Sequence, residues 1–230
     1  MKTSLSDSWH PTPDSNLGVL WDLDGVLVDS AEAHYQAWVE TCAKYAFPFG
    51  RATFQRTFGM NNAGIIATLA KRQVTPELDG EISDYKEEVF RRAIRGHVRL
   101  FPGVKLWLER FQEASIPQAV ASSAPLANID VIVDELSIRS CFAALVSGAE
   151  MPGKPNPAVF FEAARQIGIS PERCLVIEDS VAGVEAACRG GMKCLAVTTT
   201  NPRPLLARAH LILETLETLS WNEIRPLFGE

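Results

Sequence analysis

The sequence predicts an α/β protein built on a doubly wound parallel sheet, and three observations support this fold class. Six short apolar runs recur along the chain, helical patterns lie between them, and the runs are mostly apolar at successive positions rather than at alternate ones. Continuous apolar character is typical of strands that are buried on both faces of a parallel sheet. The alternation of strand and helix from about residue 98 onward indicates that helices cover both faces of that sheet.

The six apolar runs are the expected strands. They cover residues 17–21, 117–122, 143–147, 174–178, 193–197 and 210–213. Helices are expected at residues 103–114, 156–169 and 180–192. The second of these helices has Pro157 in its first turn and closes near Gly168, whereas the third begins after the capping residue Ser180 and ends at Gly190 and Gly191.

Residues 30–97 interrupt the alternation, because they contain helical patterns and no convincing strand. The helical stretches cover residues 30–47, 61–72 and 75–97. The economical arrangement is a helical cap inserted after the first strand, with the chain returning to the sheet at Pro102 and Gly103. We therefore expect a flexible tail at residues 1–16, an α/β core made of residues 17–32 and 98–230, and a helical cap at residues 33–97.

Composition and charge restrict the classes of protein to which the chain can belong. A net charge of −6 at pH 7 argues against a general nucleic-acid binder, and no apolar run approaches the roughly 18 residues that a membrane span needs. The five cysteines are scattered, with none in a CxxC pair, which favours reduced thiols over a zinc site or disulfides. The first residues lack the apolar core of a signal peptide, so we expect a cytoplasmic protein that acts as a monomer.

Polar side chains stand at or just beyond the carboxyl ends of the predicted strands. In chain order they are Asp22, Asp24, Ser122, Lys154, Glu178 and Asp179. Ligands of open parallel sheets bind beyond these strand ends. We therefore expect the six side chains to lie together at one edge of the sheet, although they come from distant parts of the chain.

The chemistry of these residues suits phosphoryl transfer. Three or more carboxylates at one edge repel each other unless a cation lies among them, and hard oxygen ligands without histidine or cysteine favour Mg²⁺. A lysine and a serine hydroxyl beside the cation can hold the oxygens of a phosphoryl group. A carboxylate can also attack phosphorus and form an aspartyl-phosphate. On this hypothesis Asp22 attacks and Asp24 moves protons.

Four motifs sharpen the hypothesis. The stretches DLDGVLVDS, VASSA, GKPNP and VIEDSVAG begin at residues 22, 120, 153 and 176. In their order and separation they resemble the four motifs of the haloacid dehalogenase (HAD) superfamily, which has a Rossmann-like core, and the resemblance spans about residues 17–220. The chain is similar to the branch with a helical cap inserted after the first motif, which includes the β-phosphoglucomutase-like phosphatases.

The resemblance implies two roles within the first motif. Asp22 is expected to be the nucleophile and a metal ligand. Asp24 is expected to protonate the leaving oxygen and then to activate the water that cleaves the aspartyl-phosphate, while its backbone carbonyl contacts Mg²⁺. Family dehalogenases that cleave carbon–halogen bonds lack an aspartate at the position of Asp24, so the resemblance points to a phosphatase.

The other three motifs supply the groups that hold the phosphate and the metal. The resemblance implies that Ser122 and the amide of Ser123 bind the phosphoryl oxygens. Lys154 is expected to neutralise the nucleophile and the transferring phosphate, and Glu178 and Asp179 are expected to anchor Mg²⁺.

Three residues of the expected cap are candidates for substrate binding. His34 lies four positions before Trp38 on one helix face. In the mutase-like branch such a histidine helps to couple cap closure to the acid/base aspartate, and the alternative is a partly exposed helix histidine. Residues 58–62, FGMNN, form a loop that faces the active site in this branch. Asn61 and Asn62 therefore either contact the substrate or cap the following helix.

The leading hypothesis is a Mg²⁺-dependent phosphatase that acts on a small phosphate monoester, a sugar phosphate or related metabolite, with specificity residing in the cap. A phosphomutase of the β-phosphoglucomutase type is the alternative. Such mutases carry a basic residue before the loop glycine and an arginine after it, where this chain has Phe58 and Asn61-Asn62. A phosphonate hydrolase needs an imine-forming lysine in the cap, which the sequence alone does not place. A non-catalytic binding protein on the same fold is a further alternative.

Overall fold

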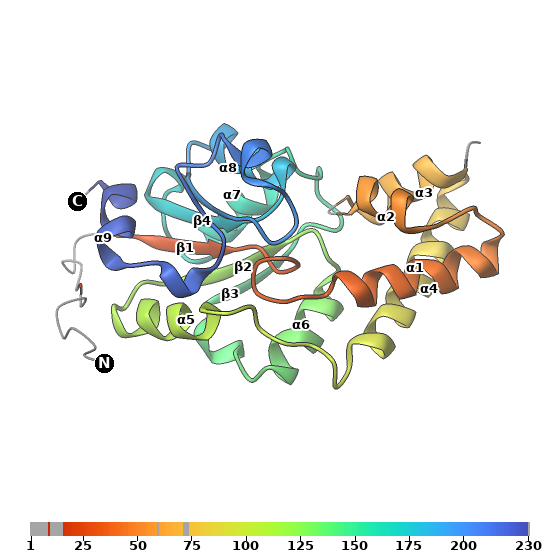
Figure 1. Ribbon diagram of the computed structural model, residues 1–230, viewed down its shortest axis with the longest axis horizontal. Coiled ribbons are helices and arrows are strands. Elements are labelled where there is room, and N and C mark those ends of the chain that lie inside the picture. The colour runs from red at the N-terminus through yellow and green to blue at the C-terminus, as the bar shows by residue number, and fades with distance from the viewer. Residues whose placement is uncertain (1–8, 10–15, 59, 71–73, 230) are drawn as a thin grey trace.

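A six-stranded parallel sheet forms the centre of the computed structural model, which describes residue 9 and residues 16–58, 60–70 and 74–229 (Figure 1). The strands are β1 (Gly18–Trp21), β2 (Gln118–Ser122), β3 (Ala144–Ser147), β4 (Cys174–Glu178), β5 (Lys193–Val197) and β6 (Leu211–Leu213). Their order is β3-β2-β1-β4-β5-β6, and every neighbouring pair is parallel. This confirms the predicted doubly wound sheet, and the direction of winding reverses between β1 and β4.

Helices cover both faces of the sheet. One face carries α5 (Val104–Glu113), α6 (Leu126–Glu135) and α9 (Trp221–Ile224), and the other carries α7 (Ala158–Gln166) and α8 (Val181–Arg189) (Figure 1). Side chains alternate across a strand, so Val19 and Trp21 of β1 pack against the first group of helices and Leu20 packs against the second. Both faces of the sheet are apolar because each is covered by helices.

Short 3₁₀ helices connect some of these elements. They cover Arg139–Cys141, Pro171–Arg173, Arg203–Leu206, Leu216–Thr218 and Arg225–Phe228.

Of the five α-helices described between β1 and β2, the first four form the insertion, residues 31–94. They are α1 (Ala31–Tyr45), α2 (Arg51–Thr57), α3 (Asn62–Ala70) and α4 (Pro76–Ile94). The insertion packs at one end of the sheet (Figure 1) around an apolar cluster of its own, which includes Trp38, Phe54 and Ile66. This separate cluster supports the predicted division into core and cap, whose boundaries stay a prediction.

The helix α4 shows how local sequence determines the ends of an element. The hydroxyl of Thr75 accepts a hydrogen bond from the backbone N–H of Leu78, and Pro76 occupies the first turn, where its missing N–H costs nothing. Arg91 and Arg92 lie in the last turn, where they complement the helix dipole.

Among the residues that the structure describes, no helix has both the length and the apolar character that crossing a bilayer requires.

Three α-helices of the described residues were absent from the prediction, namely α6, α2 and the 4-residue α9. Residues 126–135 form α6, although Ile129, Val131, Ile132 and Val133 favour strands by their intrinsic propensity. Packing of Ile129, Ile132 and Val133 against the sheet decides in favour of the helix. The second unpredicted helix is α2, which has only 7 residues and no side-chain cap at its start.

The predicted tail at residues 1–16 falls mainly outside the described residues, as do Gly59 of the 58–62 loop and residues 71–73 at the end of a predicted helix. Trp9 is the part of the tail for which most is described. Its side chain is 7% exposed, and its ring lies 5.1 Å from that of Trp221 and 5.9 Å from that of Phe228 between centroids. At Trp9 the segment is therefore anchored on the C-terminal helices.

Candidate active site

The site lies at the carboxyl ends of β1, β2 and β4, which face the insertion. In a doubly wound sheet the loops diverge where the winding reverses, and a crevice opens there. Trp21 of β1 is in register with Ile177 of β4, and the backbone N–H of Asp22 donates to the carbonyl of Ile177 over 3.0 Å. This pairing brings Asp22 beside Glu178 and Asp179, although more than half of the chain separates them.

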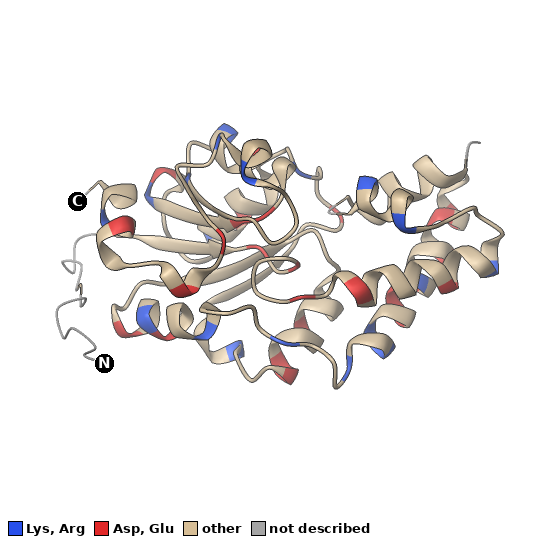
Figure 2. Ribbon diagram, in the orientation of Figure 1, with Lys and Arg blue, Asp and Glu red and all other residues tan. Residues whose placement is uncertain are grey.

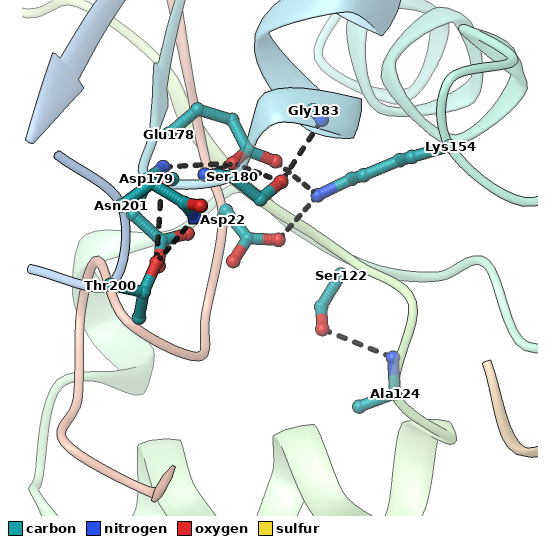
Figure 3. A network of polar contacts seen from close by, with 10 residues as sticks. All are labelled: Asp22, Ser122, Ala124, Lys154, Glu178, Asp179, Ser180, Gly183, Thr200 and Asn201. Carbon is teal, nitrogen blue, oxygen red and sulfur yellow. Dashed lines mark hydrogen bonds and ion pairs between the residues drawn. The ribbon is translucent and has the colours of Figure 1, made fainter. Parts of the chain in front are cut away.

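Three buried carboxylates gather at this point (Figure 3). Asp22, Glu178 and Asp179 each offer an oxygen atom, and these oxygens all lie within 4.8 Å of one another. Figure 2 shows acidic positions of the backbone at the end of the sheet that lies nearer the insertion. The structure therefore brings together three of the four residues that were predicted to be metal ligands.

Lys154 partly neutralises this cluster. Its Nζ donates to Oδ1 of Asp22 over 2.5 Å and to Oε1 of Glu178 over 2.6 Å, and its side chain is buried (Figure 3). Burial alone lowers the pKa of Lys154, but the charges of Asp22 and Glu178 outweigh it and hold the pKa well above its ordinary value. The ammonium is therefore a permanent positive charge at the nucleophile position.

One ammonium does not balance three carboxylates. Burial raises the pKa of Asp22 to about 7 despite the opposing effect of Lys154. Burial and the charges of Glu178 and Asp22 raise the pKa of Asp179 well above its ordinary value. Burial also raises the pKa of Glu178, but Lys154 and the backbone N–H groups of Ser180 and Asp179 together lower it by more, and the net pKa lies below the ordinary value. The raised pKa values of Asp22 and Asp179 show that crowding of the three acids disfavours their ionised forms, which a dication would stabilise.

Glu178 is held by the start of α8. Its Oε2 accepts hydrogen bonds from the backbone N–H groups of Asp179 and Ser180, and from the hydroxyl of Ser180. Ser180 in turn accepts a hydrogen bond from the N–H of Gly183, as its predicted capping role requires. A Cβ atom at Gly183 would overlap the carboxylate of Glu178, so this position needs glycine for the close approach of helix and carboxylate.

The loop after β5 supports Asp179 and was missed by the sequence analysis. The hydroxyl of Thr200 donates to Oδ2 of Asp179, and Nδ2 of Asn201 donates to the backbone carbonyl of Asp179 over 3.1 Å. Nearby, Gly25 has a φ of 88°, and a Cβ there would overlap the carboxylate of Asp179. The available signal was position, because Thr200 lies three residues beyond the end of β5, as Asp24 does beyond the end of β1.

The carboxylate of Asp24 lies outside the three-carboxylate cluster. Its Oδ1 accepts a hydrogen bond from the hydroxyl of Ser30, and Nε2 of His34 lies 3.3 Å from the same oxygen. Burial raises the pKa of Asp24, but His34, Ser30 and Lys86 together lower it by more, so the net pKa lies below the ordinary value. The prediction of metal contact through the backbone carbonyl of Asp24 stays a prediction.

His34 lies where the first motif meets the insertion, and it is partly covered. Its side chain is 11% exposed, its ring stacks on Phe90 with 3.9 Å between centroids, and its Nδ1 lies 2.9 Å from Nζ of Lys86. An ammonium group can only donate, so Nδ1 accepts and Nε2 carries the proton that faces Asp24. The structure thus links Asp24 to the insertion through His34.

Lys86 is the residue of the insertion that sequence reasoning did not find. It is buried on α4, and its Nζ donates to Oε1 of Glu87 over 2.9 Å as well as to His34. It lines the same cavity as Asp22, so a lysine of the insertion does reach the site. Its Nζ also lies over the rings of Trp38 and Phe90, so Lys86 already has an ion-pair partner and aromatic neighbours in this structure.

The remaining predicted residues border the cavity. The hydroxyl of Ser122 accepts a hydrogen bond from the N–H of Ala124 over 3.1 Å, and Ser123 lies beside it. Oδ1 of Asn61 accepts from the N–H of Gly64 over 3.0 Å, which is the predicted capping alternative. Asn62 instead donates from Nδ2 to Oε1 of Glu87 over 2.7 Å.

A cavity of about 270 Å³ lies between the sheet edge and the insertion. Among the predicted site residues, all but Glu178 line it. They are Asp22, Asp24, His34, Asn61, Asn62, Ser122, Ser123, Lys154 and Asp179. Glu178 is fully buried and contacts the cavity only through its partners.

Known proteins resemble this chain both in sequence and in fold. The family model described as haloacid dehalogenase-like hydrolase matches residues 19–197. A chloroplastic 5-amino-6-(5-phospho-D-ribitylamino)uracil phosphatase of Arabidopsis thaliana is 29% identical over 214 residues, covering 92% of this chain but 57% of that protein. The chain thus spans little more than half of that relative.

A second relative and a solved structure match over nearly their whole lengths. The β-phosphoglucomutase of Bacillus subtilis is 29% identical over 221 residues, covering 90% of this chain and 96% of that protein. The crystal structure of the Clostridium difficile β-phosphoglucomutase superposes with a TM-score of 0.83 at 21% identity, covering 92% of this chain and 96% of the other. The chain therefore belongs to the haloacid dehalogenase-like hydrolase family, and its fold is that of β-phosphoglucomutase-like members.

Proposed function

We propose that this protein is a Mg²⁺-dependent phosphatase that hydrolyses a small phosphate monoester, a sugar phosphate or related metabolite, through an aspartyl-phosphate. The observation that carries the proposal is the contact of Lys154 with both Asp22 and Glu178 at the edge of a three-carboxylate cluster. A buried cation beside a candidate nucleophile suits a negatively charged phosphoryl group. Relatives named as phosphatases support the same activity.

The donor set fits Mg²⁺. The cluster offers carboxylate oxygens from Asp22, Glu178 and Asp179 within 4.8 Å of one another, with no nitrogen or sulfur ligand in that group, and such hard donors are those that Mg²⁺ prefers. Asp22, Asp179, Glu178 and the backbone carbonyl of Asp24 would hold the ion. When bound, it would neutralise charge on the phosphoryl oxygens during transfer.

In the first step an oxygen of Asp22 attacks phosphorus, and the bond from phosphorus to the ester oxygen breaks. His34 and Ser30 favour the ionised form of Asp24, so Asp24 takes up a proton from solvent as it leaves them, and it gives this proton to the departing oxygen, which leaves as an alcohol. Lys154 stays beside Asp22 and balances the charge of the phosphoryl group. Since Asp24 contacts Ser30 and His34 in this structure, it must exchange these partners for the ester oxygen.

In the second step water attacks the phosphorus of the aspartyl-phosphate. Asp24, now ionised, takes a proton from this water, and the bond between phosphorus and the Asp22 oxygen breaks. Inorganic phosphate leaves, Asp24 gives its proton to solvent, and both carboxyl groups return to their starting states. Closure of the insertion would exclude bulk water until the alcohol has left.

The competing function is that of a phosphomutase, and the similarity to the Bacillus subtilis β-phosphoglucomutase favours it. A mutase passes the phosphate to a second hydroxyl instead of to water. The products separate the two functions, because a hydrolase yields inorganic phosphate and a mutase yields an isomerised sugar phosphate.

The expectation of a cytoplasmic monomer without nucleic-acid partners stays a prediction.

Phosphate release from a panel of phosphorylated metabolites, with Mg²⁺ and with EDTA, tests the proposal. We expect release that needs Mg²⁺ and that Asp22→Asn abolishes. The matched control is Asp29→Asn, which alters an exposed acid outside the cavity and is expected to keep wild-type rates. Failure to release phosphate from every compound would favour the non-catalytic alternative.

A further inference from the structure

We propose that the cavity accepts phosphate monoesters whose leaving group carries no second anionic group, such as phosphorylated polyols and neutral sugars, and that it rejects bisphosphates and phosphorylated carboxylic acids. This inference rests on the proposed phosphatase function and adds the substrate class. It follows from the charges that line the cavity and from the partners that those charges already have.

Carboxylates outnumber cations among the described residues that line the cavity. Two lysines and no arginine line it, against six carboxylates. The lysines are Lys86 and Lys154, and the acids are Asp22, Asp24, Asp79, Asp84, Glu87 and Asp179. A dication at the three-carboxylate cluster offsets charge only at the end where the transferring phosphoryl group binds.

Both lysines already form ion pairs with buried carboxylates. Lys154 contacts Asp22 and Glu178 and serves the transferring phosphate. Lys86 contacts Glu87 and His34, and it is buried. A second phosphate would therefore meet no uncommitted lysine or arginine among the described residues of the wall. It would have to take Lys86 from Glu87 and leave that buried carboxylate without its cation.

The insertion contributes two acids to the wall of the cavity. Asp79 and Asp84 project from α4 into the cavity wall together with Ser83. Within the described part of the chain, neither Asp79 nor Asp84 has a hydrogen-bond or ion-pair partner from a side chain. An anion brought near these two carboxylates is repelled.

The same wall suits hydroxyl groups. A free carboxylate accepts a hydrogen bond from a hydroxyl, and the walls also carry the amide side chains of Asn61 and Asn62. Aromatic rings of Trp38, Phe54 and Phe58 line the cavity as well, and such rings pack against the apolar faces of sugars. The wall thus combines acceptors with flat apolar surface, the chemistry of a polyol or sugar site.

Matched substrate pairs test the inference. Fructose 6-phosphate is compared with fructose 1,6-bisphosphate, and glycerol 3-phosphate with 3-phosphoglycerate, by kcat/KM for phosphate release at low ionic strength. We expect the member without the second anion to be preferred by about tenfold or more. The preference should shrink at about 0.5 M KCl, because salt screens exposed charges such as that of Asp84.

Charge reversal provides the second arm. In the double variant Asp79→Lys/Asp84→Lys, the ratio of kcat/KM for the monophosphate to kcat/KM for the bisphosphate is expected to fall by about tenfold. The control is Glu77→Lys/Glu88→Lys, which makes the same charge change on α4 at exposed positions outside this cavity and should keep the wild-type preference. An unchanged ratio in the cavity variant, or wild-type turnover of both members at equal rates, overturns the inference.

Calorimetric titration of the Asp22→Asn protein with the same pairs separates this inference from the proposed function. Tighter binding of the monophosphates in the absence of any turnover by the wild type supports the charge selection and overturns the phosphatase. Turnover of bisphosphates as readily as monophosphates overturns the charge selection alone. Neither turnover nor binding of any compound overturns both.

Discussion

Asn128 donates a hydrogen bond from its Nδ2 to Oε2 of Glu87 over 2.5 Å, and this contact joins α6 beside the sheet to α4 of the insertion. The other end of the same amide accepts from Arg91 over 3.0 Å. Asn128 is 1% exposed, so both polar ends of a buried side chain are satisfied by α4. Glu87 also binds Asn62 and Lys86, and it thereby connects the cavity wall to the core.

Truncation of this contact is expected to destabilise the fold. Asn128→Ala removes two hydrogen bonds and leaves a buried carboxylate oxygen of Glu87 without that donor, so we expect a loss of about 2–4 kcal/mol in the free energy of unfolding. Denaturant titration measures it. Asn222→Ala, at an exposed position, should change the free energy by less than about 0.5 kcal/mol. Equal stability of the two variants would contradict the role of Asn128.

Glu87 should make stability depend on pH at the acidic end. Burial raises its pKa, but Lys86 and His34 outweigh burial and hold the net pKa below the ordinary value of 4.5. A depressed pKa in the folded state contributes stability above the unfolded value, and this contribution disappears as the pH falls through the folded value. The stability difference between wild type and Glu87→Gln should therefore narrow below about pH 4.5.

Urea titration at several pH values checks this prediction. The control is Glu88→Gln, which alters an exposed neighbour on the same helix. If the difference in the free energy of unfolding between wild type and Glu87→Gln stayed constant down to the acid transition, Glu87 would have no depressed pKa.

Metal binding should be visible in stability as well as in activity. A ligand that binds only the folded state at about 100 times its Kd adds about 2.7 kcal/mol, or roughly 5–10 °C in Tm for a chain of this size. We expect Mg²⁺ to raise the Tm of the wild type and not that of Asp179→Asn, which removes one carboxylate of the cluster. Calorimetry with EDTA as reference measures both shifts, and an equal shift in both proteins would place the ion elsewhere.

Asp24→Asn should separate the two chemical steps. Without an acid/base group, turnover is expected to fall by about 10²–10⁴-fold, and a substrate with a good leaving group should still phosphorylate Asp22. Mass spectrometry then detects one added phosphoryl group. The double variant Asp22→Asn/Asp24→Asn should gain none, and a phosphoryl group on the double variant would identify a different nucleophile.

Two helical glycines should respond oppositely to the same substitution. A Cβ at Gly183 overlaps the carboxylate of Glu178, whereas nothing lies within 4 Å of a Cβ at Gly80 of α4. Gly183→Ala is expected to displace Glu178 and to cost about 2 kcal/mol or more of stability and most of the activity. Gly80→Ala is expected to add about 0.5–1 kcal/mol, because alanine favours the helix. Thermal unfolding and phosphate release measure the two effects, and equal behaviour would contradict the packing at Gly183.

Features that depend on neighbouring residues in the chain could be predicted from the sequence. The strands β4 and β5 begin and end at the predicted residues, because their runs are apolar at each position that two layers of helices cover. The four motifs placed Asp22, Lys154 and Asp179 at one edge, because parallel strands end there together. Thr200 could have been found by the same rule.

Only the tertiary structure decided how the insertion meets the core. Lys86 is 52 residues from His34 in the chain, and Glu87 is 41 residues from Asn128. No local pattern distinguishes these polar residues of α4 from exposed ones such as Glu88. A buried charge is stable only where its partners converge, and that convergence depends on how α1, α4 and α6 pack, which is a property of the folded chain as a whole.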